Sequence, residues 1–344
     1  MPAMHPLRRA ACGVALVTGG CFAAASQAEW FQREAAIMGT RVAVELWADD
    51  ADAGRDAIEA VLSEMRRVDA LMSHYKPDSE LSRVNQGAAL APVPVAPELS
   101  ALIGKALQLS RLTDGAFDIT YASVGYLYDY RRHVRPSEDQ IESGLGAVNW
   151  RLVEVDRGAS TVHFARDGVR IDLGGIAKGH AVDRAIGVLQ SSGIAHAIVT
   201  AGGDSRIIGD RFGRPWMVGI RHPDDAERVI VRMPVVDEAI STSGDYERYF
   251  DEDGERYHHI IDPRTGRSAG EVRSVTIIGP DATTTDGLST SVFVLGPERG
   301  LELVARMPGV EAVIVRRDGK VLYSPGLAPP QASGGTPAQN QPEK

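Results

Sequence analysis

The sequence contains little cysteine, few aromatic residues and no run of basic side chains. Only two of its 344 residues are cysteine and 6% are aromatic. Both cysteines, Cys12 and Cys21, lie close to the N-terminus, so the remaining chain can form no disulfide and can use no thiol in catalysis. It also has no His-x-x-x-His pair, and this lack of soft ligands disfavours zinc. The net charge of −9 disfavours nucleic-acid binding.

The first residues are typical of an export signal. Arg8 and Arg9 precede an apolar or small-residue stretch over 10–25, and Ser26-Gln27-Ala28 offers small residues to a signal peptidase. The stretch is too short and too small-sided for a transmembrane helix. We therefore expect residues 1–28 to be a cleaved signal peptide and the mature protein to be periplasmic. An alternative is lipidation of Cys21, which would attach the protein to the inner membrane.

Apolar periodicity predicts an α+β fold in one domain over 29–325. Helices are expected at 52–72 and 98–112, from near Ala177, from near Asp286 and at 298–307. Strands are expected at 35–48, 152–155, 161–164, 169–173, 197–200, 206–208, 216–220, 229–235 and 275–278, with a hairpin at Asp318-Gly319. Hairpins mixed with helices favour α+β over a doubly wound parallel sheet. Residues 326–344 are rich in Pro, Gly, Ser, Ala and Gln, and the composition predicts a disordered tail.

A glycine-rich turn between a strand and a helix is the first segment that suggests chemistry. It runs Ile171-Asp172-Leu173-Gly174-Gly175-Ile176-Ala177-Lys178-Gly179. A lysine in the first turn of a helix faces the positive end of the helix dipole. A phosphate held by the helix start and Lys178 would relieve that conflict. A tight turn with an exposed lysine explains the same pattern equally well.

Another segment indicates a hard-cation site. In Thr284-Thr285-Asp286-Gly287-Leu288-Ser289-Thr290, a helix would place Asp286 and Thr290 on one face, four residues apart. Ligation by a carboxylate and a hydroxyl suits Mg²⁺. The competing interpretation is that Asp286 only caps the helix.

Two further segments are ambiguous when each is taken alone. Phe117, in Asp114-Gly115-Ala116-Phe117-Asp118, is either a contact for a planar ring or a core residue. The adjacent His258 and His259 would alternate faces on a strand, so one of them could act as a general base while the other packs elsewhere. Together, the four segments suggest phosphate binding, a ring contact, a base and a hard cation, which fits chemistry on a nucleotide-like pyrophosphate.

In this order the segments resemble the ApbE family, the FAD:protein FMN transferases. The likeness covers about residues 38–296 and rests on eight pieces, namely Met38–Thr40, Ser73–Asn85, Asp114–Thr120, Ile171–Asp183, Ala201–Asp204, Ser241–Gly244, His259–Gly266 and Asp286–Thr290. There are two small departures: His180 replaces a frequent tyrosine, and Ser205 replaces a common aliphatic residue.

The resemblance implies a two-lobed α+β fold with mixed or antiparallel sheets, flanking helices and an FAD cleft between the lobes. It implies Mg²⁺ as the cofactor and FAD as the substrate, whose FMN half passes to a threonine or serine of an acceptor protein. It places His259 beside the reacting phosphate. The expected FAD contacts are Met38, Tyr75, Ala116, Phe117, Asp118, Asp172, Lys178 and Ile261, and the expected metal ligands are Gly175 through its carbonyl, Asp286 and Thr290.

Three alternatives remain open from the residues. A hydrolase could use the same site to cleave FAD to FMN and AMP. A flavin carrier could keep FAD as a redox cofactor, although nothing in the sequence positions a redox partner. An exported scaffold would need no catalysis, and the clustered Gly, Asp, His and Lys segments argue against it. For the transferase, the resemblance implies acceptors among exported or membrane redox subunits.

Overall fold

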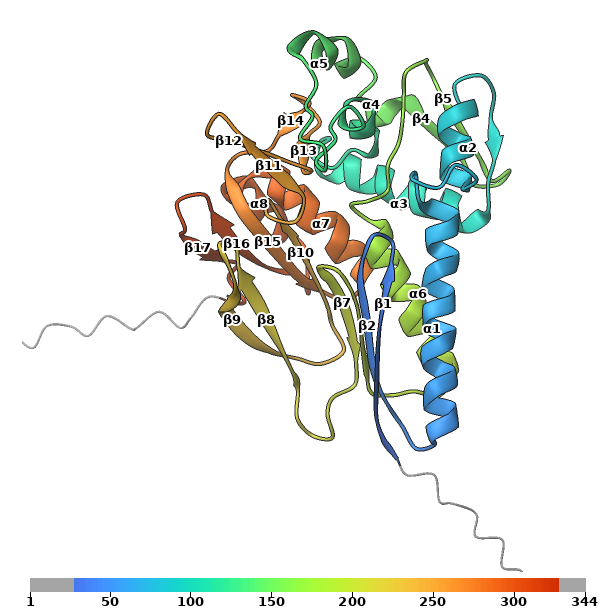
Figure 1. The fold of residues 1–344 in the computed structure, drawn as a ribbon, viewed down its shortest axis with the longest axis vertical. Helices are drawn as coiled ribbons and strands as arrows, with labels where there is room; N and C mark the ends of the chain where they lie inside the picture. The colour runs from blue at the N-terminus through green and yellow to red at the C-terminus, as the bar shows by residue number, and fades with distance from the viewer. Residues whose placement is uncertain (1–27, 328–344) are drawn as a thin grey trace, which may run out of the picture.

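An eight-stranded antiparallel sheet forms the centre of the molecule. The computed structural model describes residues 28–327, shown in Figure 1. All neighbouring strands of the sheet are antiparallel. The strands, in spatial order, are β1 (Glu29–Ile37), β2 (Thr40–Ala48), β6 (Ala197–Ala201), β7 (Asp204–Ile208), β10 (Ala239–Gly244), β15 (Val272–Gly279), β16 (Glu311–Arg316) and β17 (Val321–Tyr323). The predicted α+β class is confirmed.

The two faces of this sheet bury different partners. Along β10, Ala239 belongs to the large core beneath the helices, whereas Ile240 belongs to a second core on the other face. The same alternation occurs at Ile277 and Ile278 of β15, as expected for a strand buried on both faces. The helices are α1 (Ala51–Met72), α6 (Ala177–Ser191), α7 (Ala282–Leu295) and α8 (Pro297–Val304), and the second core lies under the hairpin of β8 (Trp216–His222) and β9 (Asp225–Val235).

Two insertions form the upper part of the molecule in Figure 1. The first, between α1 and α6, holds α2 (Glu80–Gly87), β3 (Val93–Pro94), α3 (Pro97–Leu112), the 3₁₀ turns Ile119–Tyr121 and Trp150–Leu152, α4 (Ala122–Gly125), α5 (Glu138–Leu145), β4 (Val153–Asp156) and β5 (Thr161–Phe164). The second, between β10 and β15, holds β11 (Tyr249–Glu252), β12 (Glu255–His258), β13 (Ile261–Asp262) and β14 (Arg267–Ser268).

The two insertions meet in a small apolar core of their own. Val124, Tyr128, Ile141 and Ile261 are buried together there. The Tyr128 hydroxyl donates to the Gly266 carbonyl at 2.9 Å. This contact fixes the second insertion, which carries His259, against the first, which carries Phe117 and Asp172.

Three of the expected elements were wrong in detail. The strand expected at 35–48 is a hairpin, because Met38 and Gly39 both have positive φ and turn the chain between β1 and β2. Residues 169–173 form no strand; instead, the Asn85 side chain bonds the backbone N–H and carbonyl of Ile171. The helix expected near Asp286 begins at Ala282, because Asp281 is its N-cap and accepts a hydrogen bond from the Thr284 N–H.

The remaining helices expected at 52–72, 98–112, from Ala177 and at 298–307 are present as α1, α3, α6 and α8, with small differences at their ends. The hairpin at Asp318-Gly319 joins β16 to β17. In the described range 28–327, no helix is both long and apolar enough to cross a membrane. Residues 1–27 of the expected signal peptide, including Cys21, and residues 328–344 of the expected tail lie outside the described residues.

Candidate active site

The glycines of the 171–179 segment allow α6 and α7 to approach each other closely. A Cβ on Gly179 would lie 2.1 Å from the Ala282 carbonyl oxygen, and one on Gly175 would lie 3.2 Å from Thr290 Oγ1 and 3.3 Å from Phe117 Cε2. Gly179 therefore has to lack a side chain for the turn to reach α7, and Gly175 is packed tightly against α7 and Phe117. The segment thus brings Phe117, Gly175 and Thr290 into one place.

Lys178 lies between two buried carboxylates. Its Nζ is 2.8 Å from Asp204 Oδ2 and 3.4 Å from Asp286 Oδ1, and it donates to the Gly174 carbonyl at 3.3 Å. Burial lowers the pKa of Lys178, but the two carboxylates outweigh it, so the net pKa lies above its ordinary value. A lysine in the first turn of α6 is therefore balanced by carboxylates, which the sequence alone did not indicate.

Asp286 is buried and points toward α6. Its Oδ2 accepts the Gly179 backbone N–H at 2.9 Å, and only 2% of the residue is exposed. Burial and the charge of Asp204 raise its pKa, while Lys178 lowers it to a smaller extent. Because Asp281 caps α7, the interpretation of Asp286 as a helix cap is wrong, and its carboxylate instead contacts Gly179 and Lys178 of α6.

The donor set around Asp286 fits a hard cation. Thr290, one helical turn further along α7, lies beside Gly175, and Ser243 Oγ is 3.3 Å from Thr290 Oγ1. Two buried carboxylates, Asp204 and Asp286, face the single cation Lys178, and the raised pKa of Asp286 indicates that a further positive charge would be favourable there. Within residues 28–327, no group of three or more His, Cys, Asp or Glu side chains gathers at a metal-binding distance. Mg²⁺ needs only one or two carboxylates, so the oxygen-only set agrees with that ion and disagrees with zinc.

The two adjacent histidines have different environments. His258 ends β12 and is buried, and its Nε2 lies 2.7 Å from the Ala269 carbonyl. His259 follows the strand, and its backbone N–H donates to the Arg248 carbonyl at 3.1 Å. The Nδ1 of His259 is buried and has no hydrogen-bond partner within residues 28–327. Burial, with Arg248, His258 and Lys178 adding to it, lowers the pKa of His259 to about 3.

Asp172 begins the glycine-rich turn and is held by three groups. Its Oδ1 accepts the Gly174 N–H at 2.6 Å, and its Oδ2 accepts the Tyr121 hydroxyl at 3.1 Å and lies 3.1 Å from His74 Nδ1. Burial raises its pKa, but the contacts with His74, Gly174 and Tyr121 outweigh burial and leave the pKa below its ordinary value. The carboxylate is therefore ionised and fixed.

The other expected FAD contacts have varied surroundings. Met38 lies in the β1–β2 turn, next to Gly39, and Tyr75 is 74% exposed. Ala116 and Phe117 are buried in the main core, and Ile261 in the small core between the insertions. Asp118 is also buried, and its side chain accepts from the backbone of Thr120 and Trp150 at 2.8 Å each. The geometry gives Asp118 a structural role in shaping this loop.

Three residues at the site were missed by the sequence reasoning. Asp204 was inside a matching segment, but its partner Lys178 lies on another element. His74 was also inside a matching segment, but its partner Asp172 is distant in the sequence. Arg248 had no local signal, because its contact with His259 depends on the fold. Gly203 gives one indirect clue: a Cβ there would lie 2.5 Å from the Thr242 carbonyl oxygen, so this turn has to pack tightly against β10.

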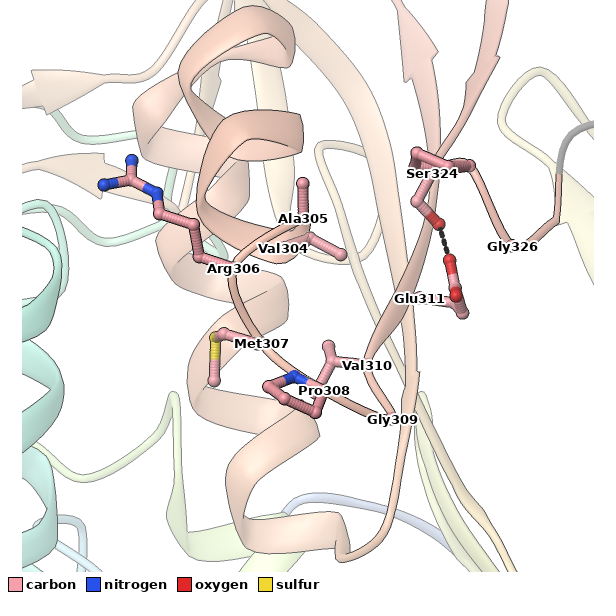
Figure 2. A pocket seen from close by; sticks show the side chains of 11 residues that line it. Val304, Ala305, Arg306, Met307, Pro308, Gly309, Val310, Glu311, Ser324 and Gly326 are labelled. Carbon is pink, nitrogen blue, oxygen red and sulfur yellow. Dashed lines mark hydrogen bonds between the residues drawn. The ribbon is translucent and has the colours of Figure 1, made fainter.

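A pocket of about 280 Å³ lies apart from these residues, beyond the end of α8 (Figure 2). It is lined by residues 304–311 and 324–326. Its Glu311 and Ser324 side chains are hydrogen-bonded to each other. None of the expected site residues lines it, so this pocket does not form part of the site.

Known proteins with the same arrangement identify the family. The profile of the ApbE family matches residues 38–314. The chain belongs to the ApbE family. The FAD:protein FMN transferase of Treponema pallidum is 33% identical over 335 residues, covering 92% of this chain and 91% of the relative. The enzyme of the same name from Vibrio cholerae is 35% identical over 261 residues, covering 74% and 78%.

Solved structures of the family have the same fold. The crystal structure of the ApbE protein of Thermotoga maritima is similar with a TM-score of 0.81 and 37% identity, covering 87% of this chain and 98% of that one. The flavin transferase ApbE of Vibrio cholerae is similar with a TM-score of 0.78 and 31% identity, again covering 87% and 98%. The expected ApbE-like α+β fold is thereby confirmed.

Proposed function

We propose that this ApbE-family chain transfers FMN from FAD to a threonine or serine hydroxyl of an acceptor protein, with the help of Mg²⁺. Its relatives carry the name FAD:protein FMN transferase. The observation that carries the proposal is the contact of Lys178, at the start of α6, with Asp204 and Asp286. Thr290 lies one turn along α7 from Asp286, and the charge of Lys178 acts on His259, whose Nδ1 has no partner within residues 28–327. A cation, a set of oxygen ligands and a neutral base are the groups that pyrophosphate chemistry requires.

In this proposal Asp286, Thr290 and the Gly175 carbonyl hold Mg²⁺. Bound there, the ion supplies positive charge that stabilises the pyrophosphate and the leaving AMP. Lys178 donates to phosphate oxygens. Its contacts with Asp204 and Asp286 hold the ammonium group in place for this role. The remaining contacts, with Met38, Tyr75 and the Phe117 and Asp172 segments, orient FAD.

His259 is the proposed general base. Its Nδ1 is buried and has no hydrogen-bond partner within residues 28–327, so this nitrogen is available to accept a proton. The acceptor hydroxyl loses its proton to His259 while its oxygen bonds to the phosphorus on the FMN side. The bond from that phosphorus to the bridging oxygen breaks, and AMP leaves with the oxygen. The product is FMN joined to the acceptor by a phosphoester.

The test is incubation of the protein with FAD, Mg²⁺ and an acceptor domain, followed by mass measurement of the acceptor. We expect the acceptor to gain FMN and AMP to appear in equal amount. The Asp286→Asn variant should lose more than about 10²-fold in rate, and the His259→Asn variant about 10²- to 10⁴-fold. Ser291→Ala is a matched control, since that hydroxyl lies next to Thr290 in sequence but bonds only the Gly287 carbonyl.

Release of free FMN and AMP without labelling of the acceptor would favour the hydrolase alternative. Bound FAD that is reduced and reoxidised without being cleaved would favour the electron carrier instead. Full activity of Asp286→Asn in the presence of chelator would remove the metal assignment.

We also propose that the protein works outside the cytoplasm, on exported or membrane redox subunits. The leader-like segment with Arg8, Arg9 and the small residues before Glu29 supports export. Mass measurement of the mature N-terminus tests it: a protein starting at Glu29 supports cleavage after Ala28. A lipid-modified Cys21 would instead support attachment to the inner membrane, and an intact leader would contradict both.

A further inference from the structure

His74 connects two residues that the proposed site uses for FAD. It follows the C-terminus of α1, and its ring centroid lies 3.8 Å from that of Tyr75, with the two planes tilted by 40°. Its Nδ1 lies 3.1 Å from Asp172 Oδ2. One side chain thus contacts an exposed aromatic ring on one side and a buried carboxylate on the other.

The contact with Asp172 reaches the phosphate-binding turn. Asp172 Oδ1 accepts the Gly174 N–H, and the Gly174 carbonyl in turn accepts from Lys178 Nζ at 3.3 Å. The second oxygen of Asp172 is shared by Tyr121 and His74. His74 is therefore one of three groups that fix the carboxylate at the head of this turn.

The contact with Tyr75 supports a ring that is otherwise unusually open. Tyr75 is 74% exposed, although large aromatic side chains normally bury much of their surface. The His74 ring restricts Tyr75 from one side and leaves the rest of its ring accessible. A planar aromatic group of a ligand can stack there without any rearrangement of the core.

We propose that His74 is a positioning residue for the substrate, which holds Tyr75 as a stacking platform for an aromatic ring of FAD and simultaneously fixes Asp172. This inference rests on the proposed function, because it assigns FAD as the ligand. His74 does not touch the reacting phosphate, so it acts on FAD binding and not on the chemical step.

The chain offers a matched control for His74. His163 also places Nδ1 near a carboxylate oxygen, 3.2 Å from Glu154 Oε2, and its side chain is 33% exposed, compared with 34% for His74. His163 lies on β5, and its side-chain partner Glu154 lies on the neighbouring strand β4, outside the proposed site. Replacing each histidine therefore removes a contact between an imidazole nitrogen and a carboxylate oxygen, once at the site and once away from it.

The experiment compares His74→Ala, His74→Gln and His163→Ala. The Kd for FAD is measured by quenching of flavin fluorescence in the presence of Mg²⁺, and kcat and KM by FMN transfer. We expect His74→Ala to raise the Kd and KM for FAD about fivefold to tenfold and to keep kcat within about twofold, a loss in line with one aromatic stack and one hydrogen bond. His163→Ala should change none of these values.

Two further readouts separate positioning from general destabilisation. Added imidazole should restore part of the FAD affinity of His74→Ala, because it can occupy the vacated space between Tyr75 and Asp172. His74→Gln, which keeps a donor toward Asp172 but no ring, should fall between wild type and His74→Ala. This variant also keeps the test valid if the alanine variant does not fold.

An unchanged Kd for FAD in either His74 variant, with melting temperatures like that of His163→Ala, would overturn the proposal. A loss of kcat with an unchanged Kd would overturn it too, since it would place His74 in the chemical step. The proposed function fails separately: wild-type protein that binds FAD and never labels an acceptor contradicts the transferase, while the comparison of Kd values still tests His74.

Discussion

Lys178 Nζ lies 2.8 Å from Asp204 Oδ2, and this pair joins the start of α6 to the start of β7 in the middle of the site. Only 2% of Asp204 is exposed. Asp204 raises the pKa of Asp286 and adds to the negative charge that the site presents to a cation. Asp204 therefore contacts the proposed phosphate-binding lysine and also contributes negative charge to the proposed metal site.

Asp204→Asn should weaken Mg²⁺ binding at least about tenfold, because it removes one negative charge from a poorly solvated cluster while keeping the shape of the side chain. Titration calorimetry with Mg²⁺ alone measures the effect. Asp139→Asn, on the exposed surface of α5, makes the same change in net charge and should leave Mg²⁺ affinity as it was. Equal affinities for wild type and Asp204→Asn would show that Asp204 does not contribute to the cation site.

Gly179→Ala should destabilise the fold by about 3 kcal/mol, because its methyl group would lie 2.1 Å from the Ala282 carbonyl oxygen and would force α6 and α7 apart. The same helix provides the control. A Cβ on Gly187 would meet nothing within 4 Å, so Gly187→Ala should be neutral or stabilise by up to about 1 kcal/mol through helix propensity. Urea unfolding of the two variants gives both values, and similar stabilities for the two would contradict the close helix crossing.

The pair Asp286 and Thr290 shows what the sequence could predict. Their spacing of four places them on one helical face wherever the helix starts, so the error of four residues in the start of α7 did not affect the site. Lys178 was likewise assigned correctly to the first turn of α6. Local periodicity and turn chemistry determine such relationships, and these do not depend on the rest of the fold.

The roles of Asp204, Arg248 and His74 could not be predicted in the same way. Each is defined by a partner on a different element, and a single sequence carries no signal for such pairing. Residues 169–173 show the same limit, because an apolar run resembles a strand while its backbone is in fact satisfied by side chains such as Asn85. The resemblance assigned His259 rather than His258, and only the fold shows the physical difference between them, namely a carbonyl partner for His258 and an Nδ1 of His259 without one.

His258 should make the fold sensitive to acid. Burial lowers its pKa from 6.5 to about 4 in the folded protein. Between those values the unfolded chain binds a proton that the folded chain does not, so stability falls as the pH falls from 6.5 toward 4. The contribution of His258 to the free energy of unfolding should thus drop by about 2 kcal/mol between pH 7 and pH 5.

His258→Gln tests this directly. The difference in unfolding free energy between wild type and the variant is measured by urea unfolding at pH 7 and at pH 5. Asp286, whose pKa is raised, acts in the opposite direction in the wild type and in the variant alike, so it cancels in the difference. A difference that is independent of pH would mean that His258 is not kept neutral by burial.

Arg248 is a cation at the site without a carboxylate partner. Its carbonyl accepts the His259 N–H, and a Cβ on Gly39 would lie 3.7 Å from Arg248 Nη2, so its guanidinium lies near the β1–β2 turn that carries Met38. Within residues 28–327 its side chain forms no ion pair, and the residue is exposed. A guanidinium in this position can donate a charge-assisted hydrogen bond to a phosphate oxygen.

Arg248→Gln should therefore raise the KM for FAD about tenfold, as expected for the loss of one charge-assisted hydrogen bond to phosphate. Arg248→Lys should recover part of the affinity, because it restores the charge without the planar fork of donors. Arg228→Gln, on the exposed hairpin of β8 and β9, changes the net charge equally and should have no effect. Steady-state FMN transfer gives the KM for FAD of all three variants. Repeating it at several salt concentrations tests the electrostatic contact, because salt should reduce the difference in KM between wild type and Arg248→Gln. Identical KM values for wild type and Arg248→Gln would show that Arg248 does not bind the phosphates of FAD, which would leave this role to Lys178 and the metal site.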